Sequence, residues 1–147
     1  MAHVRKQIRD KFTELLSAGV PLVSTRVYGS RVYPLTEAKL PAITVYAGGE
    51  TSGLQTMGLK TLTRTVSVSV DVYARATQTL DDDLDAICVQ VEEAIAAQYT
   101  LNGLSKNTVL SSTDIDFSGE AEQPVGVARL NFDVLYHTDI DDAETAK

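Results

Sequence analysis

Two stretches of the chain carry apolar residues three and four positions apart, which is the pattern of a helix with one buried face. The first begins at Val4 and ends near Ala18, where Gly19 and Pro21 form a usual helix stop. The second runs from about residue 80 to Gln98 and opens with three aspartates, which suit the positive end of a helix dipole. The sequence therefore predicts two amphipathic helices.

Other stretches alternate apolar and polar residues, as half-buried strands do. The clearest spans residues 63–74, with valine at every second position. Weaker alternation predicts strands over 42–47, 109–117 and 126–137, and residues 25–33 indicate a short hairpin or bent strand. Residues 48–60 hold four glycines and little periodicity, so we expect a long Gly-rich loop there.

Together these elements predict one α+β domain. Each helix and the sheet have one apolar side to bury, so the economical packing places both helices on one face of a mainly antiparallel or mixed sheet. We assign residues 1–138 to this single domain. Residues 139–147 carry four acidic residues and one large apolar residue, so we expect an acidic, flexible C-terminal tail.

Charge is unevenly divided along the 147 residues, which hold 13 basic and 20 acidic side chains. Ten basic and five acidic residues lie up to Arg75, and three basic and fifteen acidic residues follow from Ala76. Either these charges simply solvate the surface, or opposite sides of identical subunits attract each other head to tail. The net charge of −7 argues against broad binding to DNA phosphates.

The acidic run at the second helix imitates a calcium-binding loop. The carboxylates have the required spacing, but Ala86 stands where the loop needs glycine, and the helical pattern would spread the ligands around a cylinder. Their better interpretation is a solvated helix start. Four carboxylates make this match: Asp81, Asp83, Asp85 and Glu92.

Candidates for other chemistry are equally weak. Gly53, Gly58 and Lys60 approximate a phosphate-binding loop, but no helix pattern follows to direct amides at a phosphate. One cysteine and two histidines are too few for a disulfide or an ordinary zinc site within the chain. We therefore expect no enzyme activity, no cofactor and no metal.

A set of ordered segments carries a family resemblance: RVYGSRVYPL, LPAITVYAGGE, DVYARA, DDDLDAICVQVEEAI, TLNGL and ARLNFDVLYHT. Taken in this order, from Val4 to Thr138, the chain resembles the tail terminator proteins of long-tailed bacteriophages, of the minor tail protein U type. The resemblance rests on short motifs and overall pattern.

The resemblance implies a structural virion protein at the head-proximal end of the tail, assembled in the host cytoplasm. Such subunits form a hexameric ring on the finished tail tube, stop its polymerisation and present a head-tail joining surface. The implied partners are further copies of the chain, the tail tube protein and a head-side neck or connector protein. DNA passes through the ring without sequence-specific binding, and no membrane is involved.

Six residues are candidates for these contacts. Arg26, Arg31, Arg64 and Arg75 are candidates for contacts between subunits or with the tail tube. Asp114 and Asp116 alternate outward from a predicted strand and are candidates for an acidic lumen or for assembly. Two alternatives stay open: another neck component, such as a tail-completion or head-closure protein, and a small ligand-binding α/β domain, which needs a pocket with converging polar groups.

Overall fold

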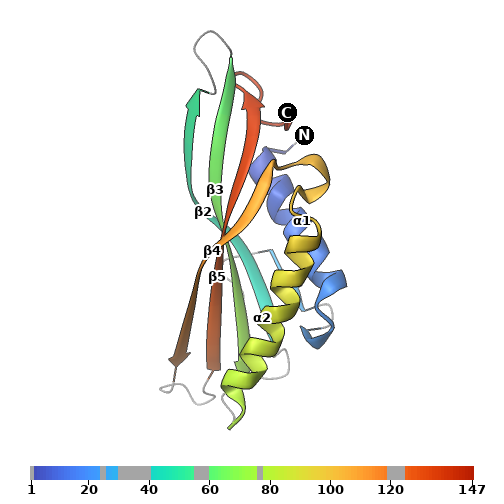
Figure 1. Cartoon of the computed structure of the whole chain (residues 1–147), viewed down its shortest axis with the longest axis vertical. Coiled ribbons are helices and arrows are strands. Elements are labelled where there is room, and N and C mark those ends of the chain that lie inside the picture. Colours follow the sequence, from blue (N-terminus) through green and yellow to red (C-terminus); the bar gives the residue numbers. More distant parts are fainter. Residues whose placement is uncertain (1, 24–25, 30–40, 55–59, 76–77, 119–124) are drawn as a thin grey trace.

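The computed structural model describes residues 2–23, 26–29, 41–54, 60–75, 78–118 and 125–147. The described chain has two α-helices, α1 (Val4–Gly19) and α2 (Leu80–Ala97), and two short 3-10 turns, η1 (Pro21–Val23) and η3 (Leu101–Gly103). Its strands are β1 (Val27–Tyr28), β2 (Ala42–Leu54), β3 (Thr61–Arg75), β4 (Asn107–Ser118) and β5 (Val125–Asp139). Both predicted helices and the four longer strands are therefore confirmed (Figure 1).

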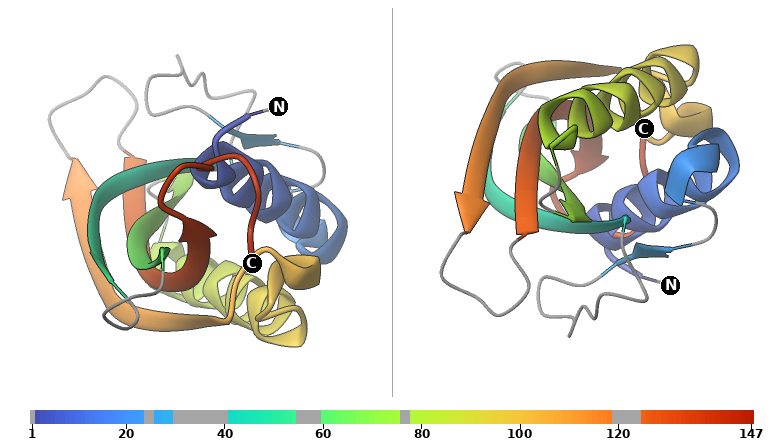
Figure 2. Two further views of the ribbon diagram at one scale, coloured as in Figure 1. Left: turned by 90° about the horizontal axis from the view of Figure 1, so that it is seen from above. Right: turned by 90° about the horizontal axis from the view of Figure 1, so that it is seen from below.

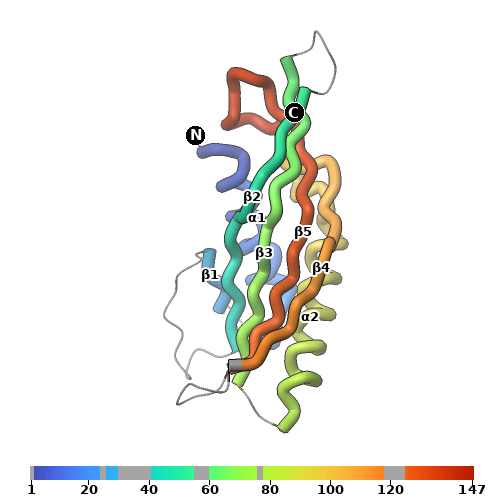
Figure 3. The backbone as a smooth tube through the Cα atoms, turned by 90° about the vertical axis from the view of Figure 1, so that its left-hand side faces the viewer, coloured from blue at the N-terminus to red at the C-terminus, as the bar shows by residue number. Residues whose placement is uncertain are grey.

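The strands form one sheet in the order β1-β2-β3-β5-β4 (Figure 3). β1 is parallel to β2, and every other neighbouring pair is antiparallel. Viewed along the long axis, the sheet curves around α1 and α2, which lie together on its inner side (Figure 2). This arrangement confirms the α+β prediction of a mixed sheet with two helices on one face.

The predicted Gly-rich loop over residues 48–60 is wrong for its first half. β2 continues to Leu54 and pairs with β3, from Glu50 opposite Val66 to Leu54 opposite Leu62. Residues 51–54 are exposed, so this part of the strand has no apolar face and lacks the alternation by which a strand is recognised. Its partner β3 supplies the pairing instead. Residues 55–59 of the predicted loop lie outside the described residues.

The predicted hairpin at residues 25–33 is only partly visible. The described part contains the two-residue strand β1, and residues 30–40 lie outside the description. β1 adds to the edge of β2 through Val27 opposite Ile43 and Tyr28 opposite Thr44.

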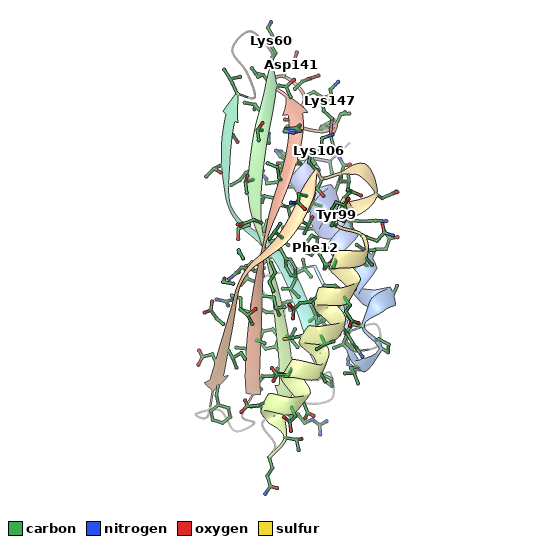
Figure 4. All side chains as sticks on the ribbon, viewed as in Figure 1. Phe12, Lys60, Tyr99, Lys106, Asp141 and Lys147 are labelled. Atoms are coloured by element: carbon green, nitrogen blue, oxygen red, sulfur yellow. The ribbon has the colours of Figure 1, made fainter. Side chains whose placement is uncertain are left out.

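The core lies between the two helices and the inner face of the sheet. α1 contributes Val4, Ile8, Phe12 and Leu16, which are fully buried. The ring of Phe12, labelled in Figure 4, meets Phe132 of β5 edge to face with centroids 5.6 Å apart, an arrangement that aromatic pairs favour. The alternating valines of β3 complete this layer: Val66, Val68, Val70 and Val72.

The C-terminal residues return to the start of α1. The amide of Val4 donates to the Ala143 carbonyl at 2.9 Å, and the Gln7 side chain donates to the Glu144 carbonyl at 2.8 Å. Lys60, Asp141 and Lys147 gather at the same end of the molecule (Figure 4). These bonds attach residues 139–147 to α1, and the flexibility we expect of this tail stays a prediction.

Candidate functional site

A buried carboxylate, Glu50, joins four elements on the inner side of the sheet. A β-bulge between Ala47 and Glu50 shifts the register of β2, so that Glu50 lies opposite the core residue Val66. Arg5 of α1 donates to its Oε2 at 2.7 Å, and Arg64 of β3 donates to the same oxygen at 3.4 Å. The Tyr136 hydroxyl of β5 donates to Oε1. We call Glu50, Arg5, Arg64 and Tyr136 the inner cluster.

Arg64, a candidate interface residue, is thus engaged within the subunit. The residue is 9% exposed, its Nε donates to the Thr138 hydroxyl at 2.9 Å, and its guanidinium lies 6.0 Å from the Tyr136 ring centre. Burial, followed by the hydrogen bond to Glu50, raises the pKa of Tyr136 far above its ordinary value. A contact of Arg64 with another subunit or the tube stays a prediction.

A second carboxylate, Asp71, occupies the helix-free face of the sheet. Arg129 of β5 donates to Asp71 from Nε at 2.9 Å and from a terminal nitrogen at 3.2 Å. The hydroxyls of Tyr46 and Tyr73 donate to the same carboxylate at 3.1 and 3.5 Å. Asp71 is 2% exposed beneath these side chains. We call Asp71, Arg129, Tyr46 and Tyr73 the outer cluster.

Electrostatics of the outer cluster follow from this geometry. Burial, and then the negative charge of Asp71, raise the pKa of Tyr46 and of Tyr73, so both hydroxyls stay protonated donors. The hydrogen bonds and charge of Asp71 raise the pKa of Arg129. The cluster borders a cleft of about 520 Å³ that also includes Asp114 and Asn131.

Asp114 and Asp116 project from β4 on the same helix-free face as the outer cluster. Asp114 lies opposite Arg129 and Asp116 opposite Val127, and both acids are exposed. The Phe117 amide donates to Asp116 at 2.8 Å. Their outward direction agrees with the strand alternation, and their place in a lumen stays a prediction.

Of the remaining candidate arginines, the described Arg26 and Arg75 both lie near Pro41. Arg26 donates from Nε to the Pro41 carbonyl at 2.8 Å and accepts the Ile43 amide at its own carbonyl, which ties β1 to β2. Arg31 lies outside the described residues. Arg75 is exposed at the end of β3, beside a cleft of about 480 Å³ lined by Leu22 and Ile87 among others.

Sheet order converts the charge division of the sequence into a division in space. The first half of the chain forms α1, β1, β2 and β3, and the second half forms α2, β5 and β4 on the other side of the sheet. α1 carries four basic and two acidic residues, whereas α2 and β4 together carry eight acidic residues and no Lys or Arg. The two lateral sides of the subunit therefore differ in charge.

Groups suited to catalysis or metal binding are sparse in the part of the chain that the structure describes. It contains no group of three or more His, Cys, Asp or Glu side chains placed to hold a metal ion. Burial, helped by Glu92 and Asp85, raises the pKa of the Cys88 thiol to about 11, which makes it a poor nucleophile. Among the described helices, none is long and apolar enough to cross a membrane.

Comparison with protein families gives a match to phage minor tail protein U over residues 3–136. The chain belongs to this family. Because the match spans nearly the whole chain, it shows that the protein is a structural component of a phage tail and therefore of a virion.

Two further comparisons add less. Among solved structures, a chain from the virion of a native gene transfer agent particle is similar, with 16% identity, coverage of 90% of each chain and a TM-score of 0.44. No curated protein sequence matches.

The sequence missed both clusters. Glu50 lay in a predicted loop, and the paired glycines before it were the one signal of a bulge. Asp71 and Arg129 stood in correctly predicted strands, but their pairing depends on register between β3 and β5, which the sequence pattern does not specify.

Proposed function

We propose that this protein caps the head-proximal end of the phage tail tube as a hexameric ring, terminates tube polymerisation and forms the head-tail joining surface. The family match over residues 3–136 carries this proposal. Capping is a binding function: one rim of the ring matches the tube subunit, and the other rim withholds the surface that the next tube ring needs. The protein acts as a structural part and not as an enzyme.

Two features of the subunit support a ring. Its lateral sides differ in charge and can attract each other head to tail, and a rotation that closes turns such heterologous contacts into a ring. Its helix-free sheet face presents hydrogen-bonding and charged groups, including Asp114 and Asp116, without a covering layer of described residues. A lumen lined by this face would carry acids that repel DNA phosphates, so that DNA passes without sticking.

Electron microscopy of the purified protein tests the ring. We expect closed rings with a central hole and a mass of about 95 kDa, six times the 15.9 kDa subunit. Tails assembled without the protein should be overlong, and adding it should restore a uniform length. Tails of normal length without the protein would contradict the capping function.

Partner choice separates this function from that of another neck component. Purified tail tubes should bind the protein at one end, and portal-side components should bind only after the tube is capped. Binding to the portal side in the absence of a tube would instead identify a head-closure protein.

A substitution tests the acidic lumen. The double variant Asp114→Asn with Asp116→Asn should leave assembly intact and slow DNA delivery. Unchanged delivery would remove these acids from the proposal.

A further inference from the structure

β4 is an edge strand with an apolar surface that the subunit leaves exposed. It stands last in the sheet order, and residues 111–117 are exposed along the whole run. Ile115 is paired with the core residue Ala128 and Phe117 with Gly126, so both point to the side of the sheet that carries the helices. They remain 56% and 57% exposed. A long edge strand with exposed apolar side chains is a ready association surface.

One flank of α2 borders this edge with negative charge. Residues 81, 85, 88 and 92 lie on one flank of the helix, because they are four, three and four positions apart. The opposite flank faces α1, since Ala94 lies against Gly19 and Gln90 accepts the Leu22 amide at 3.5 Å. The first flank therefore points toward β4.

The start of α2 reaches the exposed end of β4. Leu80 packs over Gly126, the cross-strand partner of Phe117, so Leu80 and Phe117 lie on the same side of the sheet next to Gly126. We call the following surface the acidic side: Asp81, Asp85, Glu92, Ile115 and Phe117.

The opposite lateral side of the subunit is basic. Arg5, Arg9 and Thr13 share a flank of α1 that faces β1 and β2, and Thr13 lies against Gly29 just after β1. Arg5 and Arg9 line a cleft of about 590 Å³ with residues 46–48 of β2. Arg5 is held by Glu50, whereas the Arg9 guanidinium makes no ion pair among the described residues. Lys6 follows Arg5 on α1, and its exposed ammonium pairs with the exposed Asp10 at 2.7 Å. We call Arg5, Lys6 and Arg9 the basic side.

We infer that the acidic side of one subunit docks on the basic side of a second copy of this chain, with Ile115 and Phe117 at the centre of the contact. The two sides lie at opposite ends of one sheet, so they cannot meet within a subunit. A neighbour provides the matching charge, while the aliphatic stems of the arginines cover apolar side chains. This inference rests on the proposed ring and specifies which surfaces build it.

Charge exchange tests the contact. Asp85→Lys with Glu92→Lys makes both sides basic, and Lys6→Glu with Arg9→Glu makes both sides acidic. Each variant alone should associate roughly tenfold or more weakly than the unaltered protein, because like charges then meet at every contact. An equal mixture of the two variants should associate again as alternating subunits, and so should one chain with all four substitutions. Sedimentation velocity over a range of concentrations measures these four samples and the unaltered protein.

Two further variants test whether the position of the charges matters and whether the apolar side chains contribute. Asp82→Lys with Glu93→Lys makes the same charge change on the side of α2 that points away from the sheet, and it should leave association nearly unchanged. Ile115→Thr with Phe117→Thr keeps the charge and should weaken association, while circular dichroism and thermal unfolding remain those of the unaltered protein. Both positions are exposed, so the fold does not depend on them.

The outcomes distinguish the contact from the ring function. Association that survives both charge-reversed variants overturns this inference, and so does the absence of any association of the unaltered protein up to its solubility limit. Recovery in the mixture but not in either single variant supports it. If the variants lose association while tail length stays controlled, the contact stands and the capping function fails. If association is unaffected but tails become overlong, capping stands and the contact is wrong.

Discussion

The inner and outer clusters use the same chemistry on opposite faces of the sheet. In each, a nearly buried carboxylate accepts hydrogen bonds from arginine and tyrosine. They differ in one arginine: the Arg64 side chain is 11% exposed, whereas the side chains of Arg5 and Arg129 are 41% and 49% exposed. Without a carboxylate partner, Arg5 and Arg129 return to water easily, but the buried Arg64 does not. The inner cluster therefore stabilises the fold, and the outer cluster shapes a surface.

The difference extends to the elements joined. Glu50 connects α1, β2, β3 and β5, so it fixes α1 to the sheet. Asp71 connects only the neighbouring strands β2, β3 and β5, which backbone pairing already holds. Removing the two carboxylates should separate these roles.

Glu50→Ala should be the most destabilising change. It leaves Arg64 buried without a carboxylate, and removing one partner of a buried ion pair costs about 3–5 kcal/mol. Urea unfolding monitored by circular dichroism measures the loss. The matched control is Glu14→Ala, which breaks an exposed pair with Lys11 and should cost less than about 1 kcal/mol. Equal losses in the two variants would contradict the role of the inner cluster.

Asp71→Ala should cost less, about 1–3 kcal/mol, because Arg129 and the tyrosine hydroxyls regain water on the open face. The same urea experiment applies. A loss as large as that of Glu50→Ala would show that exposure does not separate the clusters. Arg129→Met, which removes the cation and keeps the chain length, should give a similar loss if the pair acts as one unit.

Sequence pattern predicted the parts of the fold that bury an apolar face. The four-residue stripe of α1 and the valines of β3 each match a single period, and the structure places them in one core. The same logic failed at residues 48–54, where a strand without an apolar face is held by backbone pairing with β3 and by the side-chain bonds of Glu50. Alternation of apolar and polar residues signals a buried face, so it cannot detect a strand that has no buried apolar face.

Neither cluster was predictable by the same route. Glu50 is turned inward by a bulge, and Asp71 meets Arg129 through cross-strand register. Residues 50 and 136, or 71 and 129, are far apart in the chain, and one sequence contains no signal that links them. The charge division was visible in the sequence, but only the sheet order turned it into two opposite sides.

Single hydroxyl deletions compare the clusters more finely. Tyr136→Phe removes one donor to Glu50 at a fully buried position, and we expect a cost of about 1 kcal/mol. Tyr46→Phe removes a donor to Asp71 at a half-buried position, where water replaces it, and should cost about half as much. Thermal unfolding of both variants gives the comparison, and a larger loss for Tyr46→Phe would reverse it.

The smallest expected effect is a pH dependence confined to the inner side. His3 accepts the Arg5 amide at its Nδ1, and burial, followed by Arg5 and Arg64, lowers its pKa from the ordinary 6.5, against an opposing effect of Glu50. The unfolded chain therefore takes up this proton first as pH falls through about 6.5, and stability declines until the folded protein also binds it.

His3→Asn isolates this contribution. Asn keeps a helix-capping oxygen without a titrating ring, so stability should fall less between about pH 7.5 and about pH 5.5 than in the unaltered protein.

The two carboxylate variants should differ in the same pH range. In Glu50→Ala the fall in stability should be steeper, because the group that raises the His3 pKa is gone. In Asp71→Ala it should be unchanged, since the outer cluster contains no histidine. A steeper fall in Asp71→Ala as well would show that the two faces of the sheet are electrostatically coupled, and that the clusters do not act independently.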